Sequence, residues 1–149
     1  PDVGRAKAGK KLADLLGAEL AIMHKSRPSH NVSEVSSVIG DVKNKNCIVN
    51  DDMIDTAGSI SGSVRALKNA GAKTIHVCAT HGIFSGPAYD RLNIPEIEEV
   101  VVCNTVPVPL ERQNGRIKVI SVAPLFANAI RNVYTNESVS ELFDPDFAL

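Results

Sequence analysis

The sequence predicts an α/β fold with a doubly wound, mainly parallel sheet flanked by helices. Short runs of β-branched residues alternate along the chain with segments whose apolar residues recur at helical spacing. The runs are nearly continuous in apolar residues, which is typical of parallel strands covered on both faces. Because parallel neighbours need a crossover of helical length, this order favours right-handed strand, helix, strand units within a single domain, residues 1–149.

The expected strands and helices follow one another in regular order. The strands are ELAIM at 19–23, NCIVN at 46–50, TIHVCAT at 74–80, EVVVCNTV at 99–106 and IKVISVA at 117–123, and the helices lie at 6–16, 60–69 and 124–134. Gly17 and Gly71 follow the first two helices, where a residue in the left-handed conformation favours glycine. Two polar segments, 24–34 and 80–90, each follow a strand directly. We expect both to be loops at the carboxyl edge of the sheet, where open α/β sheets bind ligands.

The composition is that of a globular domain and weighs against several classes of function. With 149 residues, 44% of them apolar and 22% charged, the chain is long enough to bury a core. The net charge of −1 and the aromatic content of 4% weigh against nucleic-acid binding, and no apolar run is long enough to cross a membrane. Cys47, Cys78 and Cys103 have no paired spacing, so we expect reduced thiols in a cytoplasmic protein. The chain begins with Pro1, and we interpret it as part of a longer protein.

The stretch CIVNDDMIDTAGS, residues 47–59, holds the strongest candidate site. Asp51 and Asp52 are expected to end a strand, and Asp55 is followed by small residues that lead into a helix. Small residues let backbone N–H groups approach a ligand, and a helix N-terminus adds partial positive charge, so the loop should bind a phosphate. Adjacent carboxylates beside a phosphate need a divalent cation or sugar hydroxyls to offset their repulsion. The motif therefore predicts a site for a phosphorylated sugar.

A simpler interpretation treats the same acids as ordinary local signals. Asp51 and Asp52 would be turn residues, and Asp55 or Thr56 would cap the following helix. This interpretation explains one of the acids easily and all of them together with difficulty.

The basic segment HKSRP, residues 24–28, is also open to two interpretations. Lys25 and Arg27 could reach over a bound triphosphate and stabilise the charge that develops as a phosphate bond breaks. Alternatively, they could form a solvated basic turn before Pro28.

The motif DDMIDTAGS resembles the phosphoribosyl-pyrophosphate binding motif of type I phosphoribosyltransferase-fold proteins. Further blocks occur in the order found in the C-terminal half of the ribose-phosphate pyrophosphokinases, which the chain resembles over essentially its whole length. These blocks are PDVGR, HKSRP, NVSEV, GDV, ATHGIFSGPA, CNTVP and ESVSELF. One short acidic motif could mislead, but several blocks in register very rarely do.

The resemblance implies an enzyme that transfers the diphosphoryl group of ATP to the anomeric hydroxyl of ribose 5-phosphate, giving phosphoribosyl pyrophosphate and AMP. The substrate-binding positions that it implies are Asp51, Asp52, Asp55, Thr56, Ala57, Gly58 and Ser59, the first acids for the ribose hydroxyls and the loop for the 5-phosphate. It implies catalytic roles for Lys25 and Arg27, and it makes Asp2 a ligand of Mg²⁺. Ser138, Val139 and Ser140 match a regulatory phosphate site at a subunit contact, so a homo-oligomer is expected.

The resemblance also implies that the chain is one domain of a two-domain enzyme whose N-terminal domain, with most of the ATP pocket, is absent here. We therefore expect little activity from this chain alone. Two alternatives remain. A base-transferring phosphoribosyltransferase would need a hood segment that the sequence does not show, and a non-catalytic regulatory subunit would have no need of Lys25 and Arg27.

Three further polar residues sit in or after expected strands. Asn50 departs from the family pattern, which is usually apolar at that position, so its side chain needs a partner or exposure. His76 lies inside a strand and is expected to be structural, whereas His81 follows a strand and is expected to position a loop.

Overall fold

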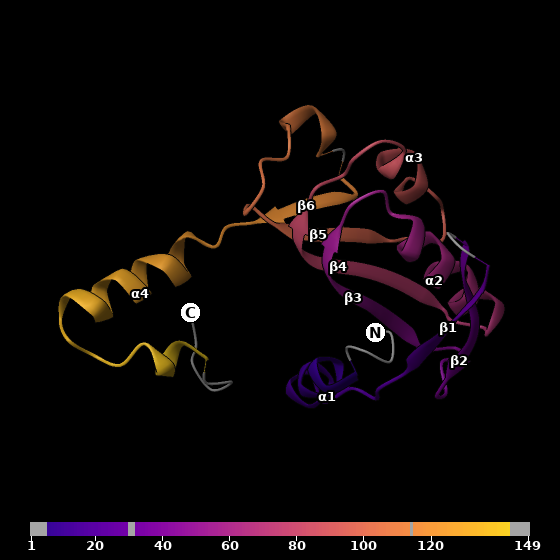
Figure 1. The fold of residues 1–149 in the computed structure, drawn as a ribbon, viewed down its shortest axis with the longest axis horizontal. Helices are drawn as coiled ribbons and strands as arrows, with labels where there is room; N and C mark the ends of the chain where they lie inside the picture. The colour runs from indigo at the N-terminus through magenta and orange to yellow at the C-terminus, as the bar shows by residue number, and fades with distance from the viewer. Residues whose placement is uncertain (1–5, 30–31, 114, 144–149) are drawn as a thin grey trace.

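The structure is a computed structural model, and it confirms the predicted α/β class with a mainly parallel sheet flanked by helices. It describes residues 6–29, 32–113 and 115–143, with 25–29 and 32–36 described as backbone only. The parallel sheet has four strands in the order β3-β4-β5-β6. Their bounds are Asn46–Ile54, Thr74–Gly82, Glu99–Cys103 and Ile117–Ile120, and the connecting helices are α2 (Gly58–Asn69), α3 (Ala88–Leu92) and the short 3₁₀ helix η2 (Leu110–Arg112). Because all four strands run the same way, their carboxyl ends meet at one edge (Figure 1).

A second, antiparallel sheet corrects the expectation for residues 24–34. β1 (Ile22–Ser29) and β2 (Val32–Ile39) form a two-stranded sheet in which Ile22 pairs with Ile39. The expected strand at 19–23 and the loop that was expected after it are therefore wrong, since the basic segment itself is a strand. The second arm, VSEVSSVI, is rich in β-branched residues, which favour a pleated surface. Pro28 falls where the register is irregular, so its missing N–H removes no regular ladder bond.

The hydrophobic core lies between one face of the parallel sheet and α2. Ile75, Val77 and Val100 are fully buried, and Val64 of α2 is buried with them. Along β4 buried residues alternate with half-buried ones, so the opposite face of the sheet is only partly covered. Ile48 on that face is 52% exposed. The expectation of strands covered on both faces is thus correct for one face only, because an apolar run does not reveal which helices cover it.

The ends of the helices agree with the sequence signals. α1 (Ala6–Leu15) lies next to the edge strand β3 in Figure 1, and Gly17 after it has a φ of 59°. Gly71 follows α2 with a φ of 88°, which confirms the expected left-handed residue. The N–H of Ala72 then donates to the carbonyl of Leu67 at 3.0 Å.

The last helix, α4 (Ala123–Tyr134), begins one residue before its expected start and stands away from the sheet in Figure 1. Its principal contact is the 3₁₀ helix η3 (Ser140–Phe143). Ile130 and Val133, apolar residues of the helix expected at 124–134, are mostly exposed rather than packed in the core. In the part of the chain that the structure describes, no helix is long and apolar enough to span a bilayer.

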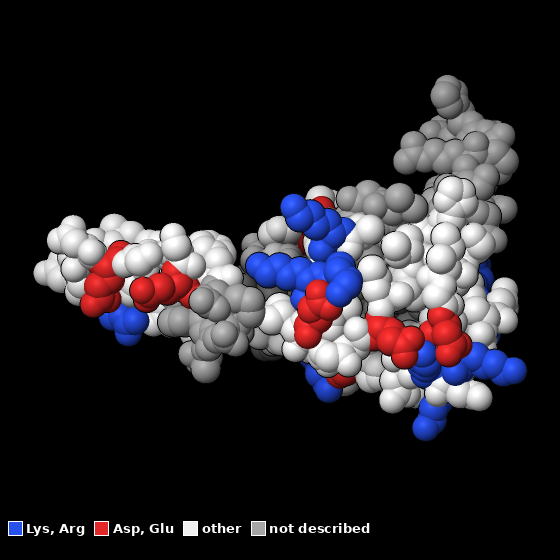
Figure 2. Space-filling model, turned by 90° about the horizontal axis from the view of Figure 1, so that it is seen from below, with Lys and Arg blue, Asp and Glu red and all other residues white. Residues whose placement is uncertain are grey.

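Charged side chains of both signs lie next to one another on the face drawn in Figure 2. Among the ion pairs of the structure, Lys45 contacts Glu19 at 2.8 Å and Asp41 at 3.1 Å. The mixture agrees with a net charge of −1 over the whole sequence.

We expect Ile75→Ala to lower the free energy of unfolding by about 2–5 kcal/mol, because Ile75 is fully buried between strand and helix and its truncation leaves a cavity. Ile48→Ala is the matched control on the neighbouring strand, with an expected loss of less than about 1 kcal/mol because Ile48 is half in solvent. Urea unfolding followed by circular dichroism measures both. Equal losses in the two variants would contradict the burial of Ile75 and the exposure of Ile48.

Candidate functional site

The acidic motif and the loop after it enclose a hollow of about 290 Å³, lined by every residue from Asp51 to Ile60. Asp51 and Asp52 were expected to end the strand, and this expectation is wrong because β3 continues to Ile54. Asp51 pairs with Ala79 and Ile54 with Gly82, so the ladder with β4 extends past both acids. Main-chain pairing with a long neighbour here overrides the low strand propensity of aspartate. The acids therefore lie on a strand that is paired with β4 rather than on a loop.

Backbone hydrogen bonds orient the two adjacent carboxylates. The N–H of Asp52 donates to the carboxylate of Asp51 at 2.9 Å, and the N–H of Met53 donates to the carboxylate of Asp52 at 2.9 Å. Oriented carboxylates of this kind are suitable acceptors for hydroxyl groups of a ligand.

The loop turns into α2 through Ala57, which has φ 58° and ψ 15° and occupies the N-cap position. A left-handed alanine is sterically costly, and such strain is concentrated at functional sites. Within the described residues, no side chain caps α2, so the simpler interpretation of Asp55 or Thr56 as its cap is wrong. Gly58, Ser59 and Ile60, the first residues of α2, line the hollow. The positive end of the helix therefore borders the same space as the acids.

The segment after β4 holds the loop from the other side. The N–H of Ser85 donates to the carbonyl of Asp55 at 3.1 Å, and its hydroxyl donates to the Asp55 carboxylate. Arg91 of α3 donates from Nη1 to the carbonyl of Thr56 at 2.9 Å. Sequence reasoning missed Ser85 and Arg91 as site residues. Ser85 lies in the block ATHGIFSGPA, but Arg91 lies in no motif and had no signal.

His81 and Thr105 link the ends of the two central strands. His81 Nδ1 lies 2.8 Å from the Thr105 hydroxyl, which itself donates to the carbonyl of Thr80 at 3.0 Å. Because the single hydroxyl proton is used in that second bond, His81 donates from Nδ1 and Thr105 accepts. His81 thus contacts the loop after β5, as a positioning residue would.

Polar side chains on the half-covered face of the sheet contact one another across neighbouring strands. Asn50 has the partner that its position requires, since its side-chain oxygen lies 3.3 Å from the thiol of Cys78. His76 Nδ1 lies 3.0 Å from Glu99, whose second oxygen lies 2.5 Å from Lys118. The hydrogen bond from Lys118, and next that from His76, hold the pKa of Glu99 below its usual value. His76 is therefore part of a structural network across three strands.

The cysteines on the sheet are unpaired and half-buried. Burial raises the pKa of the Cys47 thiol and of the Cys78 thiol. A raised pKa keeps a thiol protonated at neutral pH and hence weakly nucleophilic. Cys47 and Cys78 accordingly give no indication of a nucleophilic role.

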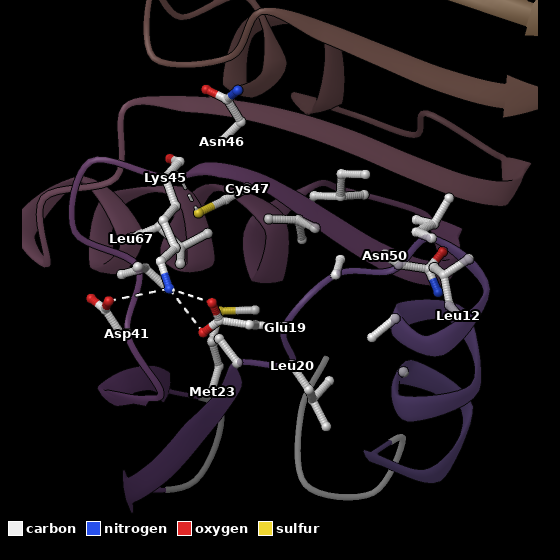
Figure 3. Close-up of a pocket in the computed structure, with 18 of the residues that line it drawn as sticks. Leu12, Glu19, Leu20, Met23, Asp41, Lys45, Asn46, Cys47, Asn50 and Leu67 are labelled. Carbon is white, nitrogen blue, oxygen red and sulfur yellow. Dashed lines mark hydrogen bonds and ion pairs between the residues drawn. The ribbon is translucent and has the colours of Figure 1, made fainter.

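A second hollow, of about 340 Å³, lies between α1 and β3 and is drawn in Figure 3. Its walls are mainly apolar, with Leu12, Met23 and Leu67 among them. Lys45 at its rim is paired with Glu19 and Asp41, and the hydrogen bond to Glu19, then that to Asp41, raise the pKa of Lys45. This hollow has neither a loop of small residues nor an open helix N-terminus, so its chemistry does not suit a phosphate. The smaller, polar hollow is the better candidate.

Of the remaining predicted site residues, the structure describes the side chains of Ser138, Val139 and Ser140 only. Lys25 and Arg27 lie in the part of β1 for which the structure describes the backbone only. Asp2 lies outside the described residues. Ser138 and Val139 lie between α4 and η3, and Ser140 is the first residue of η3. This segment follows α4, which stands away from the sheet in Figure 1. There the buried Asn132 donates to the carbonyl of Ser138 at 2.8 Å. The structure therefore joins residues 51–59 into one site and leaves 138–140 separate from it.

Among the described residues, no group of three or more His, Cys, Asp or Glu side chains is placed to hold a metal ion. Magnesium commonly binds through one or two carboxylates together with substrate phosphates and waters. The carboxylates that line the hollow are thus compatible with a metal that arrives with a phosphorylated substrate.

The fold and the site define the class of this chain: an α/β protein in which acidic residues of β3 and a strained loop lie at the carboxyl edge of a parallel sheet. The family model described as "Phosphoribosyl synthetase-associated domain" matches residues 4–144. The chain belongs to this family.

Relatives and a solved structure agree with that assignment. A ribose-phosphate pyrophosphokinase from Clostridium acetobutylicum is 50% identical over 146 residues, which cover 98% of this chain and 46% of the relative. One from Aquifex aeolicus is 46% identical over 143 residues, covering 96% of this chain and 46% of the relative. The crystal structure of phosphoribosylpyrophosphate synthetase from Mycobacterium smegmatis superposes with a TM-score of 0.81 at 45% identity, over 91% of this chain and 44% of that one. The chain spans less than half the length of these relatives.

We expect Glu99→Gln to destabilise the protein at neutral pH, because it removes the charge that Lys118 and His76 stabilise. A carboxyl whose folded pKa is depressed contributes stability above its unfolded pKa and loses it as pH falls through the folded pKa. The difference in unfolding free energy between wild type and Glu99→Gln should therefore shrink steadily as the solution is acidified below about pH 4.5.

The control for this experiment is Glu98→Gln, the neighbouring exposed position. Urea unfolding at a series of pH values measures both variants against wild type. A difference for Glu99→Gln that does not depend on pH would show that the network is not electrostatic in origin.

Proposed function

We propose that this chain, residues 1–149, is the ribose 5-phosphate-binding C-terminal domain of a two-domain ribose-phosphate pyrophosphokinase. Membership of the family supports the proposal, as does the common name of the relatives that the chain matches over most of its own length. The coverage of under half of each relative supports a partial enzyme. The order of the sequence blocks is the reason for proposing the C-terminal half.

The observation that carries the proposal is the hollow lined by Asp51 to Ile60. It combines oriented carboxylates on a paired strand with a strained turn at a helix N-terminus that no described side chain caps. Carboxylates accept hydrogen bonds from sugar hydroxyls, and backbone N–H groups at a helix N-terminus bind a phosphate. Its volume of about 290 Å³ is near the lower limit for small-molecule pockets, which suits a sugar phosphate.

In the proposed reaction the diphosphoryl group of ATP passes to the anomeric hydroxyl of ribose 5-phosphate, with AMP as the second product. Asp51 and Asp52 would bind the ribose hydroxyls, and Asp55, Thr56, Ala57, Gly58 and Ser59 would hold the 5-phosphate. Lys25 and Arg27 would stabilise charge on the phosphates of ATP during transfer. The other domain would supply most of the ATP pocket, so that this chain alone has little activity.

The accompanying proposals concern the metal, the assembly and the regulatory site. Mg²⁺ would be held by Asp2 together with phosphate oxygens and waters, and would neutralise phosphate charge. We propose a homo-oligomer in the cytoplasm, with Ser138, Val139 and Ser140 at a regulatory phosphate site on a subunit contact. The unpaired thiols support a reducing compartment.

Titration of the chain with ribose 5-phosphate tests the binding part of the proposal. We expect the amide resonances of Thr56 to Ser59 to shift, because their N–H groups border the phosphate position. Asp51→Asn should weaken binding by about 10–100-fold, since it removes a charged acceptor of hydroxyl groups. Asp41→Asn, at the rim of the other hollow, is the control and should bind as wild type does. If the amide resonances of Thr56 to Ser59 do not shift, the proposed phosphate site is wrong.

Lys25→Ala in the complete two-domain enzyme tests the catalytic part. We expect the rate of AMP formation to fall by about 100–1,000-fold while ribose 5-phosphate still binds, because a charge-stabilising cation is lost. Lys43→Ala, an exposed lysine outside the motif, is the control. An unchanged rate would overturn the role of Lys25 and favour a regulatory subunit.

A further inference from the structure

The phosphate loop, residues 55–59, needs external support. Ala57 holds a left-handed conformation that alanine does not favour, and Asp55, Thr56, Gly58 and Ser59 around it are exposed. A strained residue persists where the surrounding structure fixes it in place. The contacts that fix this loop are therefore part of the site.

Two of these contacts come from the segment that follows β4. Ser85 binds Asp55 through its own N–H and hydroxyl, and Arg91 donates from Nη1 to the carbonyl of Thr56 at 2.9 Å. Asp55 and Thr56 are the two residues before Ala57, so all three hydrogen bonds act at the entrance to the strained turn. Arg91 lies 35 residues from Thr56 in sequence, which makes its contact a product of the tertiary fold.

The backbone on either side of Arg91 is packed into the core. Its neighbours in α3, Ala88 and Leu92, are almost completely buried. Phe84 is also buried, and its ring occupies the space beside Gly82, where a Cβ would lie 2.6 Å from the ring. The backbone that carries Arg91 is thereby held against the core.

The guanidinium of Arg91 also lies beside the start of α2. A Cβ built on Gly58 would be 3.4 Å from Arg91 Nη1, so the cation is next to the first residue of the helix. A cation is unfavourable at the positive end of a helix dipole. An anion bound there would interact favourably with the Arg91 guanidinium and with the positive end of α2. The cation would also offset the repulsion between that anion and the nearby carboxylates of Asp51, Asp52 and Asp55.

We propose that Arg91 is a positioning residue of this site. It fixes the Thr56 carbonyl before the strained turn and adds positive charge where the phosphate of the ligand binds. This inference rests on the proposed function, since it assigns Arg91 to the same phosphate loop. The ligand group that it recognises is a phosphate monoester, and the neutral sugar gains nothing from it.

The test compares Arg91→Gln and Arg91→Lys with the control Arg65→Gln, an exposed arginine on α2. Ribose 5-phosphate and ribose are titrated separately into the chain, and thermal midpoints are recorded without ligand. We expect Arg91→Gln to weaken ribose 5-phosphate binding about tenfold. We expect it to leave weak ribose binding unchanged and to leave the thermal midpoint close to that of wild type. Arg91→Lys should recover part of the lost affinity because it restores the charge.

The outcomes separate a failure of the role of Arg91 from a failure of the proposed function. Wild-type affinity in Arg91→Gln would overturn the role of Arg91 while leaving the proposed function intact. A lower thermal midpoint with unchanged affinity would likewise overturn it and leave a purely structural contact. If wild type itself does not bind ribose 5-phosphate, the proposed function fails. The amides of Thr56 and Ala57 in the free protein then test the contact alone, since they should shift in Arg91→Gln and not in Arg65→Gln.

Discussion

The parallel ladder between β3 and β4 is the constraint on which the site depends. It continues past the acids to pair Ile54 with Gly82, so the two strands end side by side. The N–H groups of Ile83 and Phe84 then donate to the carbonyl of Ile54, each at 3.0 Å. Both chain segments that leave the sheet at this edge are consequently held together at their origin. A shorter ladder would leave the loop after β3 without the partner that fixes its shape.

Much of the fold is encoded locally and could be predicted from the sequence. The apolar runs of the parallel strands and the helices that precede Gly17 and Gly71 have clear periodicity and end signals. The antiparallel pair β1 and β2 was missed because its first arm is polar and contains Pro28, both typical of loops. The half-covered sheet face was missed for a different reason, since coverage depends on where helices pack and not on the strand itself.

The candidate site shows the same division between local and tertiary information. Residue types and spacing were sufficient to identify Asp51, Asp52 and the small residues of the loop. They could not show that an alanine, Ala57, adopts the left-handed conformation, since that residue type seldom does. Nor could they find Arg91, which reaches the loop only through the packing of α3. The roles of Lys25 and Arg27 remain predictions from resemblance.

The exposed apolar stripe of α4 bears on how this chain unfolds. Phe126, Ile130 and Val133 are mostly in contact with water, and the helix is supported chiefly by η3. A segment with little buried apolar surface opens at low free energy, independently of the global transition. Two levels of stability therefore coexist in one chain, a cooperative sheet with α2 and a terminal unit that can open alone. Amide hydrogens of α4 would exchange with solvent long before those of β4.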